Sequence, residues 1–407
     1  MCKAIFVNRF FYPDQSATSQ ILSDLLFNVE SQIKSEIHVV TSRNTYQNDE
    51  RLKAFEKHKN INIHRIWTTR FGRSNLLGRA IDYFSFYMST FVVLLWLAKK
   101  HDLIVVKTDP PIISYVPYVV SKIKKTYLIN WIQDLFPEVA SGLNMIKSDS
   151  LSYGLMKKIK NISLKSADMN IAIGHKMQDL LVEEGVSKDK TTVIDNWNVN
   201  AAPERIARDD NYLIDEWGLR NKFIVSYSGN FGRAHEYNII KELVEHYKHD
   251  ESLVILFIGG GKYYDDIKEQ VEKSSINNVL FKPYQDIDKL NFSLSLADLH
   301  IISLRPELEG LILPSKFYGL ASIGAPVLYI GDKQGDISRT IKKNTCGYTF
   351  EADEKENIVQ LIDQLKTGEN NTRQVTENLL NLYQAEYKPE VAYAKWLNIL
   401  HRYDHEG

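Results

Sequence analysis

Short apolar runs alternate with longer amphipathic segments along most of this chain. In the first half the runs occupy residues 4–7, 37–40, 61–66, 103–106, 127–132, 171–173 and 192–194. Runs of this length, separated by segments with helical periodicity, are typical of βαβ units that form a parallel sheet. The alternation therefore predicts the α/β class, with a doubly wound, Rossmann-like parallel sheet in this part of the chain.

The alternation stops at residues 196–204, which we interpret as a linker, and then restarts. The later apolar runs occupy residues 223–227, 253–258, 279–281, 299–302 and 327–330. A chain of 407 residues is also too long for one ordinary core. We therefore predict two Rossmann-like domains that face a cleft, one over residues 1–198 and the other over residues 199–387.

The end of the chain, at about residues 388–407, has the periodicity of a helix. Tyr393, Trp396 and Leu400 lie on one face of that helix. Because this face carries large rings, we expect the helix to pack back onto the first domain and bury them.

Charge is distributed unevenly along the chain. The net charge is −1, yet residues 51–125 contain 14 basic and 4 acidic side chains. This excess predicts either a solvated face or a surface for an anionic membrane, a phosphorylated substrate or nucleic acid. Basic and aromatic residues are not interleaved as in RNA-binding proteins, so we expect no nucleic-acid partner. The apolar run at 83–98 is too short to span a bilayer, and we expect a buried helix, with a helix at a membrane surface as the alternative.

The cysteine and histidine content argues against metal and disulfide chemistry. The two cysteines, Cys2 and Cys346, make neither a disulfide framework nor a four-ligand metal site. The 11 histidines show no metal-binding spacing. Arg9 interrupts the opening apolar residues too early for a signal peptide. We expect a cytoplasmic protein without a metal ion or cofactor.

Glycines and one arginine follow the strand expected at residues 223–227. Gly229 and Gly232 would let backbone N–H groups approach an anion, and Asn230 lies between them. Arg233 adds a planar set of donors that suits phosphate oxygens. A plain glycine turn with a solvated arginine is the alternative. The triple glycine at 259–261 lacks the spacing of a nicotinamide-binding motif, so we expect no such cofactor.

A second cation follows in the segment of residues 309–316. Gly310 and the Pro314-Ser315 pair mark a loop that opens into a helix, and Lys316 falls in the first helical turn. Helix dipoles disfavour cations there, so this lysine indicates an anionic partner, although a surface lysine fits as well. Together, Arg233 and Lys316 predict a clamp that stabilises a diphosphate leaving group without metal.

Asp134 closes the strand expected at residues 127–132. A carboxylate at this position is either a helix N-cap or a catalytic or substrate-orienting group. The residues by themselves leave both interpretations open.

Three segments carry a family resemblance: residues 131–138, residues 312–316 with 324–327, and residues 335–337. The chain resembles the retaining GT-B glycosyltransferases of family 4, in the bacterial O-antigen and capsule branch that includes fucosamine transferases. The likeness covers nearly the whole sequence. It implies that the second domain binds the donor nucleotide and that the first binds the acceptor.

The resemblance also implies roles for individual residues. Arg233 and Lys316 match the diphosphate-binding pair, and Gln133 or Asp134 falls where many relatives carry a histidine beside the reacting sugar. The implied donor-binding residues are Gly229, Asn230, Gly232, Arg233, Glu309, Gly310, Leu311, Ile312, Leu313, Ser315 and Lys316. The implied acceptor-side residues are Tyr12, Gln15, Ser16 and Asp109, with Asp134, Arg233 and Lys316 as the catalytic group.

Two departures from the family pattern concern the donor and acceptor loops. Residues 15–17 read Gln-Ser-Ala where relatives have a glycine pair. The paired glutamates of the family are absent, because Leu311 and Gly319 occupy their positions, and Glu309 is the nearest carboxylate.

The expected activity is transfer of a hexosyl or N-acetylhexosaminyl group with retention of configuration. The donor would be a nucleoside-diphosphate sugar, UDP first and GDP second. The acceptor would be a lipid-linked glycan or polysaccharide in lipopolysaccharide, O-antigen or capsule synthesis, at the inner face of the cytoplasmic membrane. A sugar-nucleotide 2-epimerase and a two-lobed sugar-binding protein without turnover are the alternatives.

Overall fold

The computed structural model describes residues 2–46, 51–72, 76–199 and 203–404, and contacts within the chain divide it into two units. The first unit comprises Met1–Val199, Gly310–Leu313 and Pro389–Gly407, and the second comprises Asn200–Glu309 and Pro314–Lys388. Residues 200–202 of the expected linker lie outside the described residues. The sequence assigns 310–313 to the second domain, whereas the structure groups this segment with the first unit.

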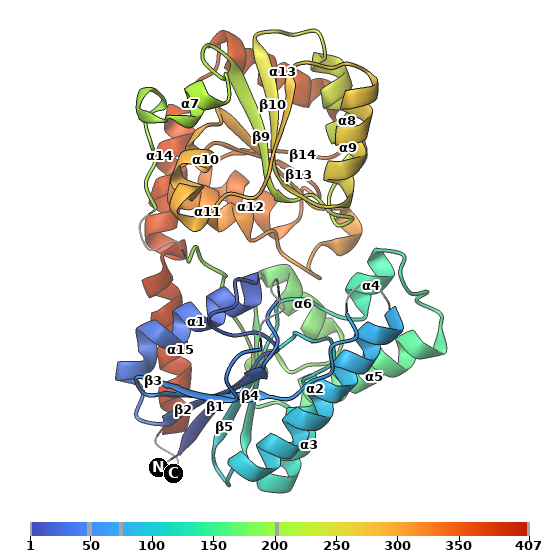
Figure 1. Cartoon of the computed structure of the whole chain (residues 1–407), viewed down its shortest axis with the longest axis vertical. Helices are drawn as coiled ribbons and strands as arrows, with labels where there is room; N and C mark the ends of the chain where they lie inside the picture. Colours follow the sequence, from blue (N-terminus) through green and yellow to red (C-terminus); the bar gives the residue numbers. More distant parts are fainter. Residues whose placement is uncertain (1, 47–50, 73–75, 200–202, 405–407) are drawn as a thin grey trace. The chain divides into compact units, whose positions relative to one another are not determined.

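The first unit contains a mostly parallel sheet with helices on both faces (Figure 1). Its strands are β1 (Lys3–Val7), β2 (Glu36–Ser42), β3 (Phe55–His58), β4 (Ile61–Ile66), β5 (Leu103–Lys107), β6 (Tyr127–Trp131), β7 (Met169–Ala172) and β8 (Thr191–Val193). Its helices are α1 (Ala17–Val29), α2 (Leu76–Leu97), α3 (Tyr115–Lys124), α4 (Glu138–Gly142), α5 (Leu151–Ser166), α6 (His175–Glu183) and α15 (Pro389–Asp404). Over the described residues the strand order is β3-β4-β2-β1-β5-β6-β7-β8.

Alternate residues of the central strands fill two separate cores in this unit. Phe6 and Val105 face α1 and α15, whereas Ile5, Val7 and Val106 face α2 and α3. A strand buried on both faces reads as a continuous apolar run, which is why the sequence revealed these strands. The antiparallel edge strand β3 alternates exposed and half-buried residues and escaped the sequence analysis.

The last helix, α15, packs against the first unit through large rings. Trp396 is fully buried, with its ring centroid 4.5 Å from that of Trp131. Tyr393 donates a hydrogen bond to the Asp24 carboxylate, which also accepts one from the Trp197 indole at 2.6 Å. The helix therefore completes the core on one face of the first sheet.

The second unit contains a six-stranded parallel sheet among the described residues, in the order β11-β10-β9-β12-β13-β14. Its strands are β9 (Phe223–Asn230), β10 (Leu253–Gly260), β11 (Val279–Lys282), β12 (Leu299–Ser303), β13 (Val327–Ile330) and β14 (Tyr348–Phe350). Its helices are α7 (Leu213–Glu216), α8 (Tyr237–Tyr247), α9 (Lys262–Lys273), α10 (Leu290–Ser295), α11 (Lys316–Ser322), α12 (Asp336–Asn344), α13 (Lys355–Thr367) and α14 (Arg373–Leu382).

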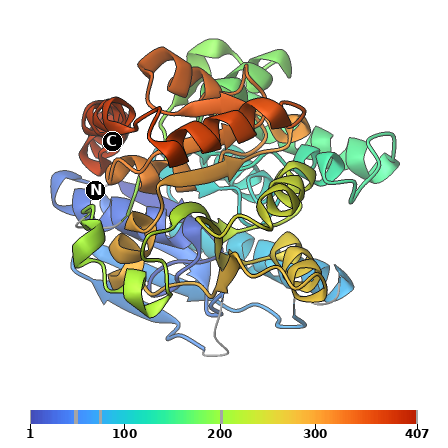
Figure 2. The ribbon, with the colours of Figure 1, turned by 90° about the horizontal axis from the view of Figure 1, so that it is seen from above.

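Helices cover both faces of this second sheet, as Figures 1 and 2 show. Helices α8, α9 and α13 pack on one core, and α7 and the segment at the end of α10 pack on the other. The predicted fold class, two Rossmann-like α/β domains with parallel sheets, is therefore confirmed.

Helix α2 differs from the expected buried helix, because only one of its faces is buried. Phe86 and Leu94 are fully buried, whereas Phe84 is 63% exposed and Trp96 is 75% exposed. By length and composition alone, Leu77–Leu97 is apolar enough to cross a membrane, with a mean hydropathy of 1.5. One face of this apolar helix therefore packs in the core, and the other face is exposed.

We predict that Trp396→Ala destabilises the first unit by about 3–5 kcal/mol, because it removes a fully buried ring. Urea unfolding monitored by tryptophan fluorescence measures the change. The control Leu151→Ala, at a side chain 94% exposed, should shift stability by less than about 0.5 kcal/mol. Equal effects of the two substitutions would mean that α15 does not belong to this core.

Candidate functional site

Three glycines shape the carboxyl end of the second sheet. Gly229, Gly259 and Gly261 have φ angles of +112°, +129° and +119°. A Cβ at Gly259 would lie 2.4 Å from the Gly229 carbonyl oxygen, and one at Gly261 would lie 2.3 Å from Oδ1 of Asn230. Only glycine allows these loops to approach so closely. The triple glycine, which the sequence analysis set aside as a cofactor motif, therefore builds the same loop as Gly229 and Asn230.

Lys316 places its ammonium group beside this loop, at the start of α11. The Nζ atom lies 3.7 Å from the centroid of the Tyr227 ring and 3.7 Å from the place of a Cβ on Gly229. It is buried and has no hydrogen-bond partner among the described residues. Burial lowers the pKa of Lys316 to about 7. An isolated buried cation is unfavourable, and a bound anion would remove the penalty.

His235 lies beside this lysine and stays neutral. Its Nδ1 atom donates a hydrogen bond of 2.6 Å to the Ser303 carbonyl oxygen. Burial, together with the charge of Lys316, lowers the pKa of His235 to about 3. Helix α8 begins two residues later, at Tyr237, so His235 belongs to the loop.

Arg233 is exposed at the end of the same loop. A second arginine, Arg305, follows β12. Its backbone N–H donates a hydrogen bond of 3.0 Å to the carbonyl oxygen of Ala234, the residue after Arg233. The Arg305 guanidinium forms an ion pair of 3.5 Å with Glu307. Arg305 could not be singled out from the sequence, because no glycine or helix start marks its position.

The predicted donor-binding residues at 309–315 have varied surroundings. Glu309 accepts hydrogen bonds from the Asp336 N–H at 3.0 Å and the Tyr329 hydroxyl at 3.2 Å, so both carboxylate oxygens already serve the second unit. Ser315 is exposed just before α11, and Ile312 is half-buried.

The segment from Gly310 to Leu313 packs with the first unit. Gly310 has a φ of +77°, and a Cβ there would lie 2.8 Å from Leu180 Cδ1. The Leu311 carbonyl oxygen accepts a hydrogen bond of 2.9 Å from the Leu135 N–H. Leu311 and Leu313 are therefore core-packing residues in this structure.

In the first unit the structure distinguishes between Gln133 and Asp134. Gln133 forms a reciprocal amide pair with Asn196, through hydrogen bonds of 3.3 and 3.1 Å. The Oδ1 atom of Asp134 is buried without a hydrogen-bond partner among the described residues. Helix α4 begins at Glu138 with Pro137 as its N-cap, so the N-cap interpretation of Asp134 is wrong. Asp134 is the better candidate for a group that meets substrate.

A buried lysine accompanies this carboxylate at the ends of β5 and β6. The Lys107 Nζ atom lies 4.0 Å from the centroid of the Trp131 ring and donates a hydrogen bond of 3.0 Å to the Thr18 carbonyl oxygen. Burial lowers the pKa of Lys107 to about 7, against the opposing charges of Asp109 and Asp134. Burial likewise raises the pKa of Asp109 to about 6. The sequence missed Lys107 because a lysine at a strand end looks solvated.

The other acceptor-side residues lie at the start of α1. Tyr12 and Gln15 are exposed. The Ser16 hydroxyl is buried without a hydrogen-bond partner among the described residues, and the Ser16 N–H donates to Asp14 at 2.8 Å. The structure thus brings Ser16, Asp109 and Asp134 to the carboxyl edge of the first sheet, where ligands bind in open α/β sheets.

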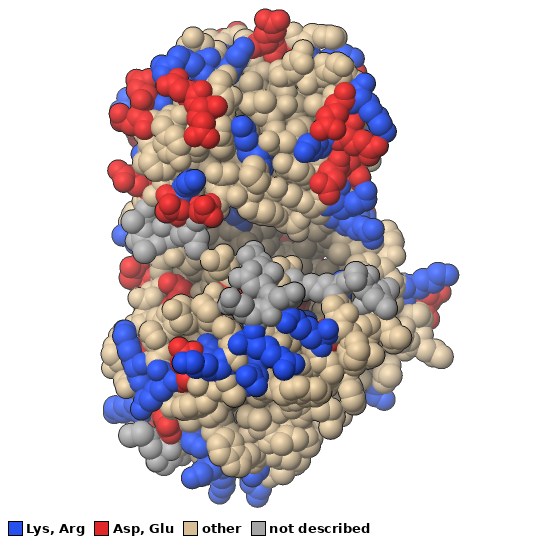
Figure 3. Space-filling view, viewed as in Figure 1, with Lys and Arg blue, Asp and Glu red and all other residues tan. Residues whose placement is uncertain are grey.

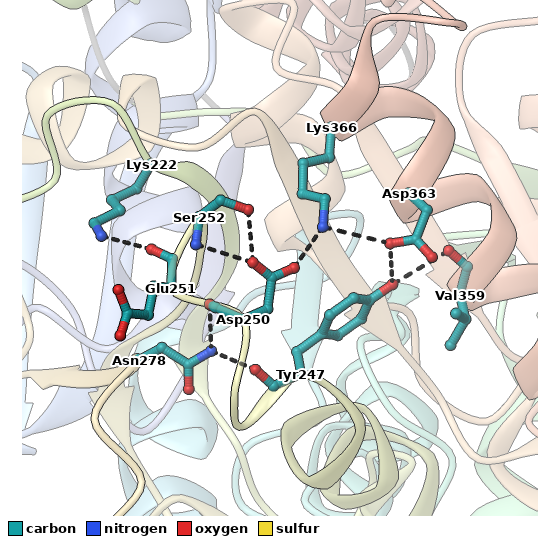
Figure 4. Close-up of polar contacts among 9 residues, drawn as sticks. All are labelled: Lys222, Tyr247, Asp250, Glu251, Ser252, Asn278, Val359, Asp363 and Lys366. Atoms are coloured by element: carbon teal, nitrogen blue, oxygen red, sulfur yellow. Dashed lines mark hydrogen bonds and ion pairs between the residues drawn. The ribbon is translucent and has the colours of Figure 1, made fainter.

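A second polar cluster lies at the opposite edge of the second sheet (Figure 4). The Asp250 carboxylate accepts from the Ser252 N–H at 2.9 Å and pairs with Lys366, and the Tyr247 hydroxyl donates to Asp363 at 3.2 Å. These contacts join α8 and α13 to each other and to the segment before β10.

Residues 213–380 match the family described as glycosyl transferases group 1. A curated relative, the probable glycosyltransferase WbjE of Pseudomonas aeruginosa, is 25% identical over 302 residues, which span 73% of this chain and 74% of that protein.

Solved structures with the same fold cover nearly the whole chain. Sucrose-phosphate synthase of Thermosynechococcus elongatus has a TM-score of 0.76 at 14% identity, and the match covers 99% of both chains. Anabaena HepE in complex with UDP-glucose has a TM-score of 0.70 at 15% identity, covering 99% of this chain and 100% of that one. WaaG, a glycosyltransferase involved in lipopolysaccharide biosynthesis, has a TM-score of 0.64 at 12% identity, covering 99% and 100%.

The two-domain fold, the family match over residues 213–380 and the likeness to WbjE together support the class of GT-B glycosyltransferases for this chain. The residues that match the glycosyl transferases group 1 family, 213–380, contain Gly229, Arg233 and Lys316.

We predict that Gly261→Ala destabilises the second unit by about 2 kcal/mol more than Gly368→Ala. Both glycines have positive φ angles, but a Cβ at Gly368 meets nothing within 4 Å, whereas one at Gly261 meets the Asn230 side chain. The control therefore measures backbone strain alone, roughly 1 kcal/mol, and the difference measures crowding of the loop. Chemical denaturation provides both values, and equal values would contradict the close packing of the glycine loops.

Proposed function

We propose that this glycosyltransferase transfers a sugar from a nucleoside-diphosphate donor, with UDP as first choice and GDP as second. The observation that carries the proposal is the buried Lys316 ammonium, which has no anionic partner among the described residues and lies beside the Gly229 loop. The HepE structure with UDP-glucose, which has the same fold, supports a nucleotide-sugar donor.

In this proposal the chain's own cations stabilise the leaving nucleoside diphosphate. Lys316, at the start of α11, would contribute one charge at close range. Arg233, in the loop that contains Gly229, would contribute a planar set of donors. The charge that develops on the diphosphate as the glycosidic bond breaks would meet both groups. The reaction would then need no metal ion or cofactor, and EDTA should leave turnover unchanged.

Asp134 would orient the donor sugar or the acceptor. Its Oδ1 atom lacks a partner among the described residues, and burial raises its pKa. The family resemblance supports retention of configuration and transfer of a hexosyl or N-acetylhexosaminyl group. Tyr12, Gln15, Ser16 and Asp109 would lie on the acceptor side.

The proposed acceptor is a lipid-linked glycan or polysaccharide in lipopolysaccharide, O-antigen or capsule synthesis. The fold shared with WaaG, the match to WbjE and the basic, apolar surface of the first unit support this choice. Such acceptors lie at the inner face of the cytoplasmic membrane, so we propose that the enzyme works there as a peripheral protein.

A sugar-nucleotide 2-epimerase is the second candidate function. Lys107 and Asp109 have pKa values moved to about 7 and about 6, and such groups can transfer protons at neutral pH. Analysis of products after incubation with a UDP-sugar and no acceptor separates the two activities. An epimerised sugar nucleotide would favour the second candidate, and an unchanged donor would favour transfer.

We predict that Arg233→Ala and Lys316→Ala each lower kcat/KM by on the order of 10² or more, because each removes a charged contact to the leaving group. Steady-state assays of nucleoside diphosphate release measure this. Lys273→Ala is the matched control, since that lysine pairs with Glu269 on the exposed side of α9. Turnover within about threefold of wild type in both site variants would refute the clamp.

We also predict that affinity for UDP-glucose falls above about pH 7. Lys316 in the free site has a pKa of about 7, and the bound diphosphate would raise it, so binding above that pH takes up a proton. The dissociation constant should be constant below about pH 7 and then rise by up to about tenfold per pH unit.

Calorimetry from about pH 6 to about pH 9 tests this dependence, and the diphosphate diester of UDP-glucose has no group that titrates there. Lys316→Arg keeps the charge throughout and should bind with little change over this range. A wild-type affinity that does not vary with pH would contradict the role of Lys316.

A further inference from the structure

We propose that α2 lays one exposed face onto an anionic lipid bilayer. The face, here called the α2 stripe, consists of Leu77, Ile81, Phe84, Met88, Val92 and Trp96. This inference deepens the proposed membrane contact by assigning it to a defined surface. It stands independently of the nucleotide clamp, which lies in the second unit.

The stripe follows the periodicity of one helix face. Its members are spaced by three or four residues, and Leu77, Phe84, Val92 and Trp96 are each more than 60% exposed, at 68%, 63%, 61% and 75%. A surface helix of a globular protein normally places polar side chains on this face. A contiguous apolar surface of this kind marks an interaction site.

The opposite face of α2 fixes the helix to the first unit. Phe86, Leu94 and Leu97 are buried in the core beneath the sheet. The helix therefore lies on the unit with its stripe outward. A membrane would receive one face of it, as in interfacial amphipathic helices, rather than the whole cylinder.

Neighbouring segments extend the apolar surface. Trp67 is 57% exposed and Phe71 is 64% exposed, in the loop that follows β4. Buried Asp82 of α2 holds this loop by accepting hydrogen bonds from the Thr69 hydroxyl at 2.8 Å and the Phe71 N–H at 2.9 Å. These hydrogen bonds fix the loop that carries the exposed rings of Trp67 and Phe71.

A recess of about 490 Å³ lies between the stripe and β4. Its walls include Trp67, Met88, Val92 and Trp96, and His64 contributes to its lining. Burial lowers the pKa of His64 to about 4, so this ring is uncharged at neutral pH. The recess has the size and polarity to accept part of an acyl chain.

The basic residues around the α2 stripe favour an anionic bilayer as its binding partner. Exposed lysines flank it: Lys53 and Lys57 beside β3, Lys99 and Lys100 after α2, and Lys122 and Lys125 around the end of α3. Figure 3 shows a largely uncharged surface over α2, with Lys and Arg gathered along its border. An anionic bilayer complements such a border. A second copy of the chain would bring two basic surfaces together, which like-charge repulsion disfavours.

The indole rings fit the same interpretation. Trp67 and Trp96 are both largely exposed and both line the recess. Tryptophan is enriched at the level of lipid headgroups, because its ring is apolar and its N–H is polar. Apolar insertion and charge attraction together should bind more stably than either alone.

Flotation of the full chain with vesicles tests the proposal. We expect binding to phosphatidylcholine vesicles that contain phosphatidylglycerol and weak binding to phosphatidylcholine alone. The double variant Phe84→Ser/Trp96→Ser should reduce binding by about tenfold or more. Lys99→Glu/Lys100→Glu should reduce it at low salt and have a smaller effect at about 0.5 M NaCl. Leu151→Ser, at a leucine on α5 that is more exposed still, is the control outside the stripe and should bind as wild type does.

Three results would overturn the proposal. They are no binding of the wild type to anionic vesicles, full binding by the Phe84→Ser/Trp96→Ser variant, or a wild-type dimer in light scattering that this variant converts to monomer. Circular dichroism verifies that the variant is folded. The thermal shift with UDP should be the same in the variant and the wild type, so failure of docking and failure of the clamp are distinguishable.

Discussion

The buried ammonium of Lys316, which has no hydrogen-bond partner among the described residues, is the feature on which the proposed donor site depends. Removing a cation from water is unfavourable, and the face of the Tyr227 ring partly offsets the loss. Three glycines with positive φ angles bring the surrounding loops close enough to shape the space beside it. The arrangement becomes favourable when an anion enters, so it favours a ligand with concentrated negative charge, such as a diphosphate.

The first unit also contains a buried lysine over an aromatic ring, but there carboxylates lie nearby. Lys107 lies over the Trp131 ring at the carboxyl edge of its own sheet, but Asp109 and Asp134 contribute opposing charges. A lysine with carboxylates beside it is better suited to bind hydroxyl groups or to transfer protons than to bind phosphates. At the amino edge of the second sheet, by contrast, the Asp250 carboxylate is paired with Lys366 and with the Ser252 N–H. The Lys316 ammonium and the Asp134 Oδ1 atom, both buried without a hydrogen-bond partner among the described residues, lie where parallel sheets bind ligands.

Particular elements show how far the sequence could be interpreted. Strands such as β1 and β10 were evident because burial on both faces demands continuous apolar residues. Strand β3 was missed because an exposed edge strand tolerates polar side chains. Lys107 was missed because its burial depends on a strand 20 residues further on.

The sequence by itself determined the α/β class, the two parallel sheets, the glycine loop with Arg233 and Lys316, and the resemblance that the family match supports. These features follow from local periodicity, glycine spacing and charge, which act over a few residues. The tertiary structure decided that Lys316 is buried without a partner, that Asp134 and not Gln133 is available, and that α2 exposes an apolar face. Burial and hydrogen bonding depend on segments distant in the chain, so only the folded arrangement could decide them.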